Sequence, residues 1–166
     1  NYRSNQKSDV FISSPSDPGN ICRSPIAEAV FQETVKKAGE ESDWDVDSAA
    51  IGDWHVGKPP DWRALKIMKN HGLDYKNSAR QIVEEDFEAF DFIFGMDHSN
   101  IVELKQMAPR NSKAKILLLG DFGLDESDKI IKDPYYDSHD KGFEKCYQQC
   151  SVASAAFLKA VKENRI

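Results

Sequence analysis

The segment GNICRSP, from Gly19 to Pro25, carries the residues best suited to chemistry. It follows a short apolar run and opens a helical pattern, so its backbone N–H groups and the helix dipole are suited to bind an anion. The guanidinium of Arg23 is suited to clamp that anion with two hydrogen bonds. An ordinary strand-to-helix turn, with Cys22 as a small buried residue and Arg23 in solvent, has the same pattern. The local sequence leaves both interpretations open.

A second candidate is the loop DPYY, which runs from Asp133 to Tyr136. An Asp in a rigid loop between aromatic residues can protonate an oxygen leaving group, but Asp-Pro is also a common turn. Trp54 and His55 lie in a loop rich in Gly and Pro. They either form the wall of a cleft for a flat aromatic ligand or cover the edge of the core.

No metal site is expected, because the four histidines lack the spacing of metal ligands. Cys146 and Cys150 lie on the apolar face of the last helical pattern, which is typical of core residues. With Cys22 they form a sparse set of three cysteines, which favours a reducing, cytoplasmic environment.

The charge balance argues against two classes of partner. The chain has 22 Lys and Arg against 28 Asp and Glu, a net charge of −6, and no dense basic run, so nucleic acid is not an expected partner. Its apolar runs are far shorter than the roughly 20 residues that cross a bilayer, so no membrane association is expected. With 166 residues, 40% of them hydrophobic, the chain can form a single domain around its own core.

Apolar periodicity predicts the elements that position these residues. Helical spacing is found over residues 24–39, 61–71, 97–107 and 143–161, and strand patterns over residues 10–12, 44–49, 90–96 and 114–119. Because strands and helices alternate, we expect an α/β fold, a three-layer sandwich with a parallel sheet. Ligands of such sheets bind beyond the carboxyl ends of the strands, and residues 17–24 are the first such place.

From Gly19 to about Lys162 the chain resembles the low-molecular-weight protein tyrosine phosphatases, particularly those of insects. The matching stretches, in chain order, are GNICRSPIAEAVF (19–31), VDSAA (46–50), GDWHVGKPPD (52–61), ARQI (79–82), FDFIFGMDHSN (90–100), SKAKILLLG (112–120), DPYY (133–136) and FEKCYQQC (143–150). The resemblance implies a four-stranded parallel sheet flanked by helices, and a cofactor-free monomer. Its substrates would be phosphotyrosine proteins or aryl phosphates, hydrolysed through a phosphocysteine, and inorganic phosphate would be a ligand.

The resemblance also implies residue roles. Arg23 would grip the phosphoryl oxygens and stabilise the transition state, and Ser24 would stabilise the thiolate. Asn20 and Ser48 would hold the shape of the loop, and Asp133 would protonate the leaving oxygen and then activate water. The phosphate-binding loop would comprise Gly19, Asn20, Ile21, Cys22, Arg23 and Ser24. The substrate pocket would be lined by Trp54, Tyr135 and Tyr136.

The chain departs from the family at the nucleophile. The family has a catalytic Cys six residues before the loop Arg, and that position is Asp17, followed by Pro18. An alignment from the strand instead places the position at Ser13, with about four extra residues in the loop. A carboxylate at this position opposes a phosphate dianion, and a hydroxyl without an adjacent base is a weak nucleophile. Cys22 is the candidate substitute thiol.

We therefore expect phosphatase activity to be lost or strongly impaired. The alternatives are a non-catalytic phosphotyrosine-binding protein and a partner-binding scaffold. Asn77, where many family members have a His, puts the rigidity of the loop network in question. Residues 1–18 are an atypical segment in place of the usual first strand and nucleophile, either a misjoined exon or part of a genuine pseudophosphatase. If they supply no strand, the sheet loses a central strand that two neighbours would pair with, and buried backbone groups lose their partners.

Overall fold

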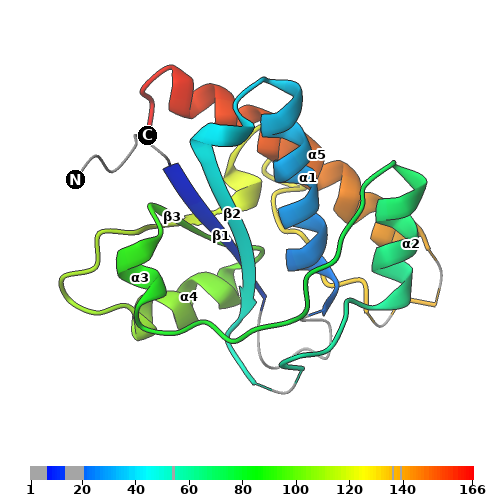
Figure 1. Cartoon of the computed structure of the whole chain (residues 1–166), viewed down its shortest axis with the longest axis horizontal. Helices are drawn as coiled ribbons and strands as arrows, with labels where there is room; N and C mark the ends of the chain where they lie inside the picture. The colour runs from blue at the N-terminus through cyan, green and yellow to red at the C-terminus, as the bar shows by residue number, and fades with distance from the viewer. Residues whose placement is uncertain (1–6, 14–20, 54, 136, 139) are drawn as a thin grey trace.

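A four-stranded parallel sheet forms the centre of the molecule, with the strand order β2-β1-β3-β4 (Figure 1). The computed structural model describes residues 7–13, 21–53, 55–135, 137–138 and 140–166. The strands are β1 (Lys7–Ser13), β2 (Trp44–Ala50), β3 (Phe92–Gly95) and β4 (Lys115–Leu118). Parallel pairing turns the carboxyl ends of all four strands to the same edge of the sheet, which is where a ligand of such a fold binds.

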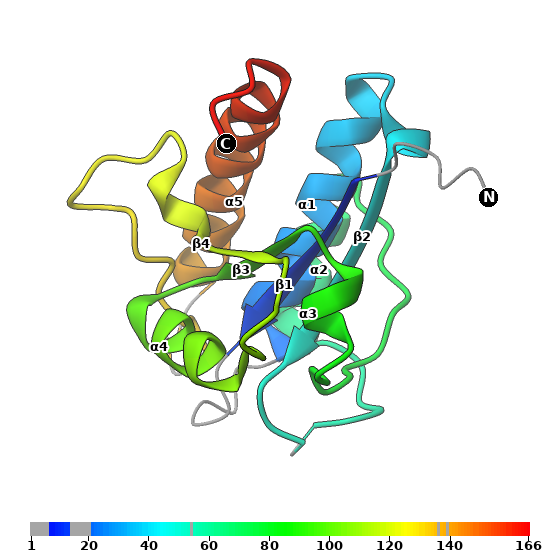
Figure 2. The same cartoon turned by 90° about the vertical axis from the view of Figure 1, so that its left-hand side faces the viewer.

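Helices cover both faces of the sheet, as Figure 2 shows from the side. One face carries α1 (Arg23–Lys37), α2 (Trp62–Asn70) and α5 (Lys141–Lys162), and the other carries α3 (Asp86–Ala89) and α4 (His98–Met107). Two short 3-10 helices, η2 (Glu41–Asp43) and η3 (Leu119–Asp121), lie at the start of β2 and after β4. These layers confirm the predicted three-layer α/β sandwich.

The N-terminal segment supplies β1, one of the two inner strands of the sheet. Phe11 of β1 is fully buried, pairs in register with Ser48 and Phe94, and stacks on the Phe94 ring at a centroid distance of 5.3 Å. Phe157 of α5 meets the same Phe94 ring edge-on at 4.8 Å. Each buried Phe contributes roughly 1.5–3 kcal/mol, so β1 is tied to the core as well as to its neighbouring strands. The weak strand expected over residues 10–12 is thus a longer strand, paired on both sides.

Side-chain caps mark the starts of two helices and glycines follow the ends of two, whereas α1 starts at Arg23 after Cys22, with no side-chain cap. Asp61 and Asp97 cap α2 and α4, each with a side-chain oxygen that accepts a backbone N–H at 2.9 Å. Gly39 and Gly72 follow α1 and α2 with φ of 72° and 74°, a conformation that glycine adopts without strain. The one-turn helix α3 was not predicted, because four residues show no helical period. None of the described helices is long and apolar enough to cross a membrane.

Candidate active site

The candidate site lies where β1 ends and α1 begins. β1 ends at Ser13, the residue that the strand-based alignment places at the nucleophile position. Asp17, Gly19 and Asn20 lie outside the described residues, so their predicted roles stay predictions. The described part of the phosphate-binding segment starts at Ile21, which is half-buried, and continues into the first turn of α1.

Arg23 opens α1 and is only 1% exposed. Its Nη1 donates to Oδ2 of Asp97 at 2.8 Å and to the carbonyl oxygen of Ile131 at 2.7 Å. The carboxylate of Asp97 compensates for burying the cation. The alternative in which Arg23 lies in solvent is therefore wrong, because this side chain links α1 both to the cap of α4 and to the chain just before Asp133.

The loop that carries Asp133 is folded back on itself. Asp133 is half-buried, and its Oδ1 accepts the backbone N–H of Tyr135 at 3.0 Å. Tyr135 packs half-buried against the main core, with its ring 5.6 Å from the guanidinium carbon of Arg63. Trp54 and Tyr136 lie outside the described residues, and their predicted place in the substrate pocket is not tested. The structure thus brings Arg23 and the Asp133 loop together, as the predicted site requires.

Cys22 lies immediately before α1 and is fully buried. Burial raises the pKa of its thiol well above the usual range, and the carboxylates of Asp61 and Asp133 raise it further. Because the thiolate is the nucleophilic form and this environment disfavours it, Cys22 is poorly suited to replace the nucleophile. Cys146 and Cys150 are buried in the core face of α5, which confirms their interpretation as core residues.

Ser48 lies in a polar cluster beneath α1. Its Oγ donates to Oε2 of Glu28 at 3.3 Å and lies 3.2 Å from the Tyr75 hydroxyl, while Asn77 donates to Oε1 of Glu28 at 2.9 Å. Glu28 is fully buried, and burial raises its pKa to about 7. Ser24, in the first turn of the same helix, is also buried. Asn77 therefore bonds to the buried side of α1, the helix that follows the phosphate-binding segment.

Three residues of the site were missed from the sequence: Asp61, Arg63 and Asp97. Both aspartates stand directly before a helical pattern, which is the signal of a helix cap. That signal predicts the cap, but it does not predict that the same carboxylate also forms an ion pair with an Arg side chain. Asp97 accepts a hydrogen bond from the Arg23 guanidinium, which lies 74 residues away along the chain.

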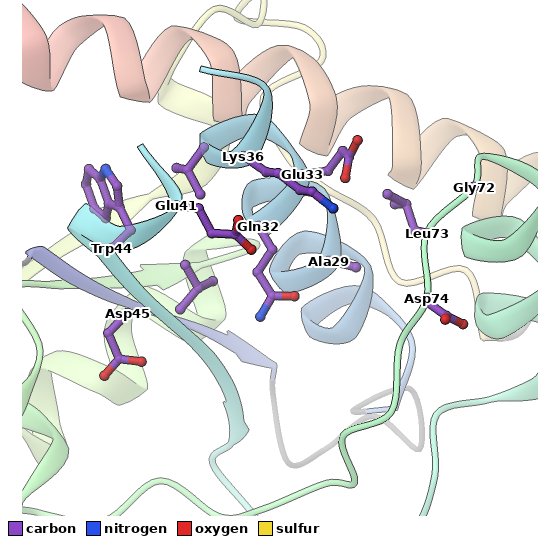
Figure 3. Close-up of a pocket in the computed structure, with 12 residues that line it drawn as sticks. Ala29, Gln32, Glu33, Lys36, Glu41, Trp44, Asp45, Gly72, Leu73 and Asp74 are labelled. Atoms are coloured by element: carbon purple, nitrogen blue, oxygen red, sulfur yellow. The ribbon is translucent and has the colours of Figure 1, made fainter. Parts of the chain in front are cut away.

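A pocket of about 520 Å³ lies at the opposite end of the sheet (Figure 3). It is enclosed by α1, by the first residues of β2 and by the segment that follows α2. Four carboxylates and one ammonium group line it: Glu33, Glu41, Asp45, Asp74 and Lys36. This negative lining repels phosphate, so the pocket is not the predicted site. In the described ranges no group of three or more His, Cys, Asp or Glu could hold a metal ion.

Comparisons with known proteins agree with this geometry. The sequence model described as "Low molecular weight phosphotyrosine protein phosphatase" matches residues 11–166. Low molecular weight phosphotyrosine protein phosphatase 1 of Drosophila melanogaster is 55% identical over 141 residues, which cover 85% of this chain and 90% of the relative. The chain belongs to the low molecular weight phosphotyrosine protein phosphatase family. The matched range begins at residue 11, inside β1. The motifs described above begin later, at Gly19.

Two solved structures show the same fold. The crystal structure of Primo-1 superposes with a TM-score of 0.87 at 52% identity, covering 92% of this chain and 97% of that one. The Drosophila arginine phosphatase DARP superposes with a TM-score of 0.87 at 38% identity, covering 95% of this chain and 98% of that one. The predicted fold and family are both confirmed.

Proposed function

We propose that this chain binds phosphotyrosine and related aryl phosphates at the carboxyl end of its sheet, with hydrolysis lost or strongly impaired. The observation that carries the proposal is the burial of all three cysteines of the chain, at Cys22, Cys146 and Cys150. The family's reaction needs an accessible thiolate to accept the phosphoryl group. Loss of such a nucleophile removes several orders of magnitude of rate while leaving binding groups in place.

The groups that recognise an anion support the binding half of the proposal. The first turn of α1 contains no acidic residue, so its N-terminal end keeps the positive potential that attracts phosphate. Arg23 adds a fixed positive charge beside this end, oriented by its bond to Asp97. Asp133, tied to the same region through Ile131, is suited to contact the bridging oxygen of an aryl phosphate. We further propose that the protein acts in the cytoplasm as a monomer.

The test combines turnover with binding. Hydrolysis of p-nitrophenyl phosphate is measured at about pH 5.5, where part of a typical carboxyl population is still protonated. Calorimetric titration with inorganic phosphate and phosphotyrosine is run on the same preparation. We expect no turnover, together with phosphate binding that weakens at least about tenfold in Arg23→Lys, because Lys cannot form the bidentate contact. Thermal melting checks that the variant is folded.

Three variants separate the alternatives. Turnover that disappears in Cys22→Ser would overturn the proposal, because Cys22 would then be the nucleophile. Restored hydrolysis in Ser13→Cys, but not in Asp17→Cys, would support the alignment from the strand, and the reverse would support the alignment from Arg23. The absence of both binding and turnover would indicate a scaffold with a degenerate pocket. Phosphoarginine is titrated in parallel, since one similar structure is that of an arginine phosphatase.

A further inference from the structure

Arg63, in the first turn of α2, holds the loop that follows Asp133. Its Nη2 donates to the carbonyl oxygen of Tyr135 at 2.9 Å, and its Nη1 donates to the carbonyl oxygen of Asp137 at 3.0 Å. Two bonds from one planar guanidinium fix both the distance and the orientation of this backbone. Tyr135 is also the residue whose N–H is accepted by Asp133. The position of the Asp133 carboxylate therefore depends on backbone that Arg63 holds.

Asp61 connects Arg63 to the phosphate-binding segment. Its two carboxylate oxygens accept Nε of Arg63 at 3.0 Å and Nη2 at 3.1 Å, and its backbone N–H donates to the carbonyl oxygen of Ile21 at 3.0 Å. The Asp61 side chain is 10% exposed and that of Arg63 is 18% exposed, so water screens this ion pair weakly. A chain of bonds thus runs from Ile21 through Asp61 and Arg63 to Tyr135.

The guanidinium of Arg63 lies over two aromatic rings. The guanidinium carbon of Arg63 lies 4.6 Å from the ring centroid of Phe143 and 5.6 Å from that of Tyr135. Phe143 is fully buried in α5, so this surface is part of the rigid core. A Lys at position 63 keeps the charge but loses the fork of donors and the stacking.

We propose that Arg63 is a positioning residue that, with Asp61, sets the place of Asp133 relative to the phosphate-binding segment. The proposal rests on the proposed function only for the role of Asp133 as the group that faces the ester oxygen. Proton donation matters most when the leaving group is a strong base. Displacement of Asp133 therefore slows the cleavage of phenyl phosphate far more than that of p-nitrophenyl phosphate.

The first test needs no turnover. Amide hydrogen exchange is measured in the chain as given and in Arg63→Lys, with Lys66→Gln as the matched control, because Lys66 pairs with Asp140 from an exposed position on the same helix. We expect the Tyr135 and Asp137 amides to exchange at least about tenfold faster in Arg63→Lys only. The amide of Ile131, which donates to Met96, reports any global loss of stability. Unchanged exchange at Tyr135 would overturn the proposal.

The second test is kinetic and uses whichever cysteine variant, Ser13→Cys or Asp17→Cys, hydrolyses aryl phosphates. In that background Arg63→Lys is expected to reduce kcat for phenyl phosphate at least about tenfold more than kcat for p-nitrophenyl phosphate. Equal losses for both esters would overturn the positioning role. If neither cysteine variant hydrolyses either ester, the missing thiol is not the sole cause of the lost hydrolysis, and the exchange result alone decides whether Arg63 holds the loop.

Discussion

Buried ionisable side chains have hydrogen-bond partners at one end of the sheet, whereas the buried Asp9 near the other end has none among the described residues. At the carboxyl ends of the strands, Arg23 is paired with Asp97, and Glu28 accepts hydrogen bonds from Ser48 and Asn77. Nearer the amino ends, Asp9 of β1 is equally buried, yet neither of its carboxylate oxygens has a hydrogen-bond partner among the described residues. An unpaired buried carboxyl costs free energy, whereas a paired one fixes the geometry around it.

This difference separates the two roles of the central layer. At the carboxyl end of the sheet, buried polar groups hold loops in fixed orientations, as a binding site requires. The amino end of β1 lies in the segment that precedes the residues matched to the family, which begin at residue 11. We interpret Asp9 as a local weakness of that segment, which the aromatic core around Phe11 offsets.

Removing the partner of Arg23 should have the largest effect. Asp97→Ala leaves the guanidinium buried without its carboxylate and removes the cap of α4, so we expect the free energy of unfolding to fall by roughly 3–5 kcal/mol. Urea unfolding measures this change, with the exposed Asp125→Ala as control. A loss of less than about 1 kcal/mol in the free energy of unfolding would contradict the comparison, because Asp97 would then contribute little to the stability of the buried Arg23.

The second prediction concerns pH and Glu28. Its folded-state pKa of about 7 lies above the ordinary 4.5, so the fold favours the protonated form. The associated stability is complete below pH 4.5 and is lost as the pH rises through about 7, by roughly 3 kcal/mol in the free energy of unfolding. Glu28→Gln should flatten this dependence in urea unfolding from pH 5 to 8. A slope identical to that of the parent chain would assign the titration to another group.

The smallest effect is expected at Asp9, where a substitution should raise the free energy of unfolding instead of lowering it. Burial raises the pKa of Asp9, with a further contribution from the negative charge of Asp45, so the folded chain resists its ionisation. Asp9→Val should raise the free energy of unfolding at pH 7 by about 1–2 kcal/mol, because an apolar side chain suits the buried position. The gain should shrink at pH 4, where the unfolded chain also holds much of the proton. Thermal melting at both pH values measures it, and a loss of stability at pH 7 would contradict the comparison.

The sequence predicted most of the fold, because the helices and strands carry clear periods. Residues 44–49 alternate and became β2, and the stripe that includes Cys146 and Phe157 became the buried face of α5. The site was predicted in part. Arg23 reaches the chain just before Asp133 because the carbonyl oxygen of Ile131 accepts a bond from it, a contact over 108 residues that no local pattern encodes. The bonds of Arg63 to the Asp133 loop were missed for the same reason.

The central position of β1 has a consequence for how the chain acquires its structure during synthesis. Phe11 pairs with Ser48 on one side and with Phe94 on the other, and the second partner lies 94 − 11 = 83 residues later. Contacts of such long sequence separation form late and slow folding, because loop closure must precede any gain from pairing. Until β3 has left the ribosome, β1 exposes one unpaired edge and an aromatic side chain. β1 therefore waits for a partner from the second half of the chain, and during that time its open edge needs protection from aggregation.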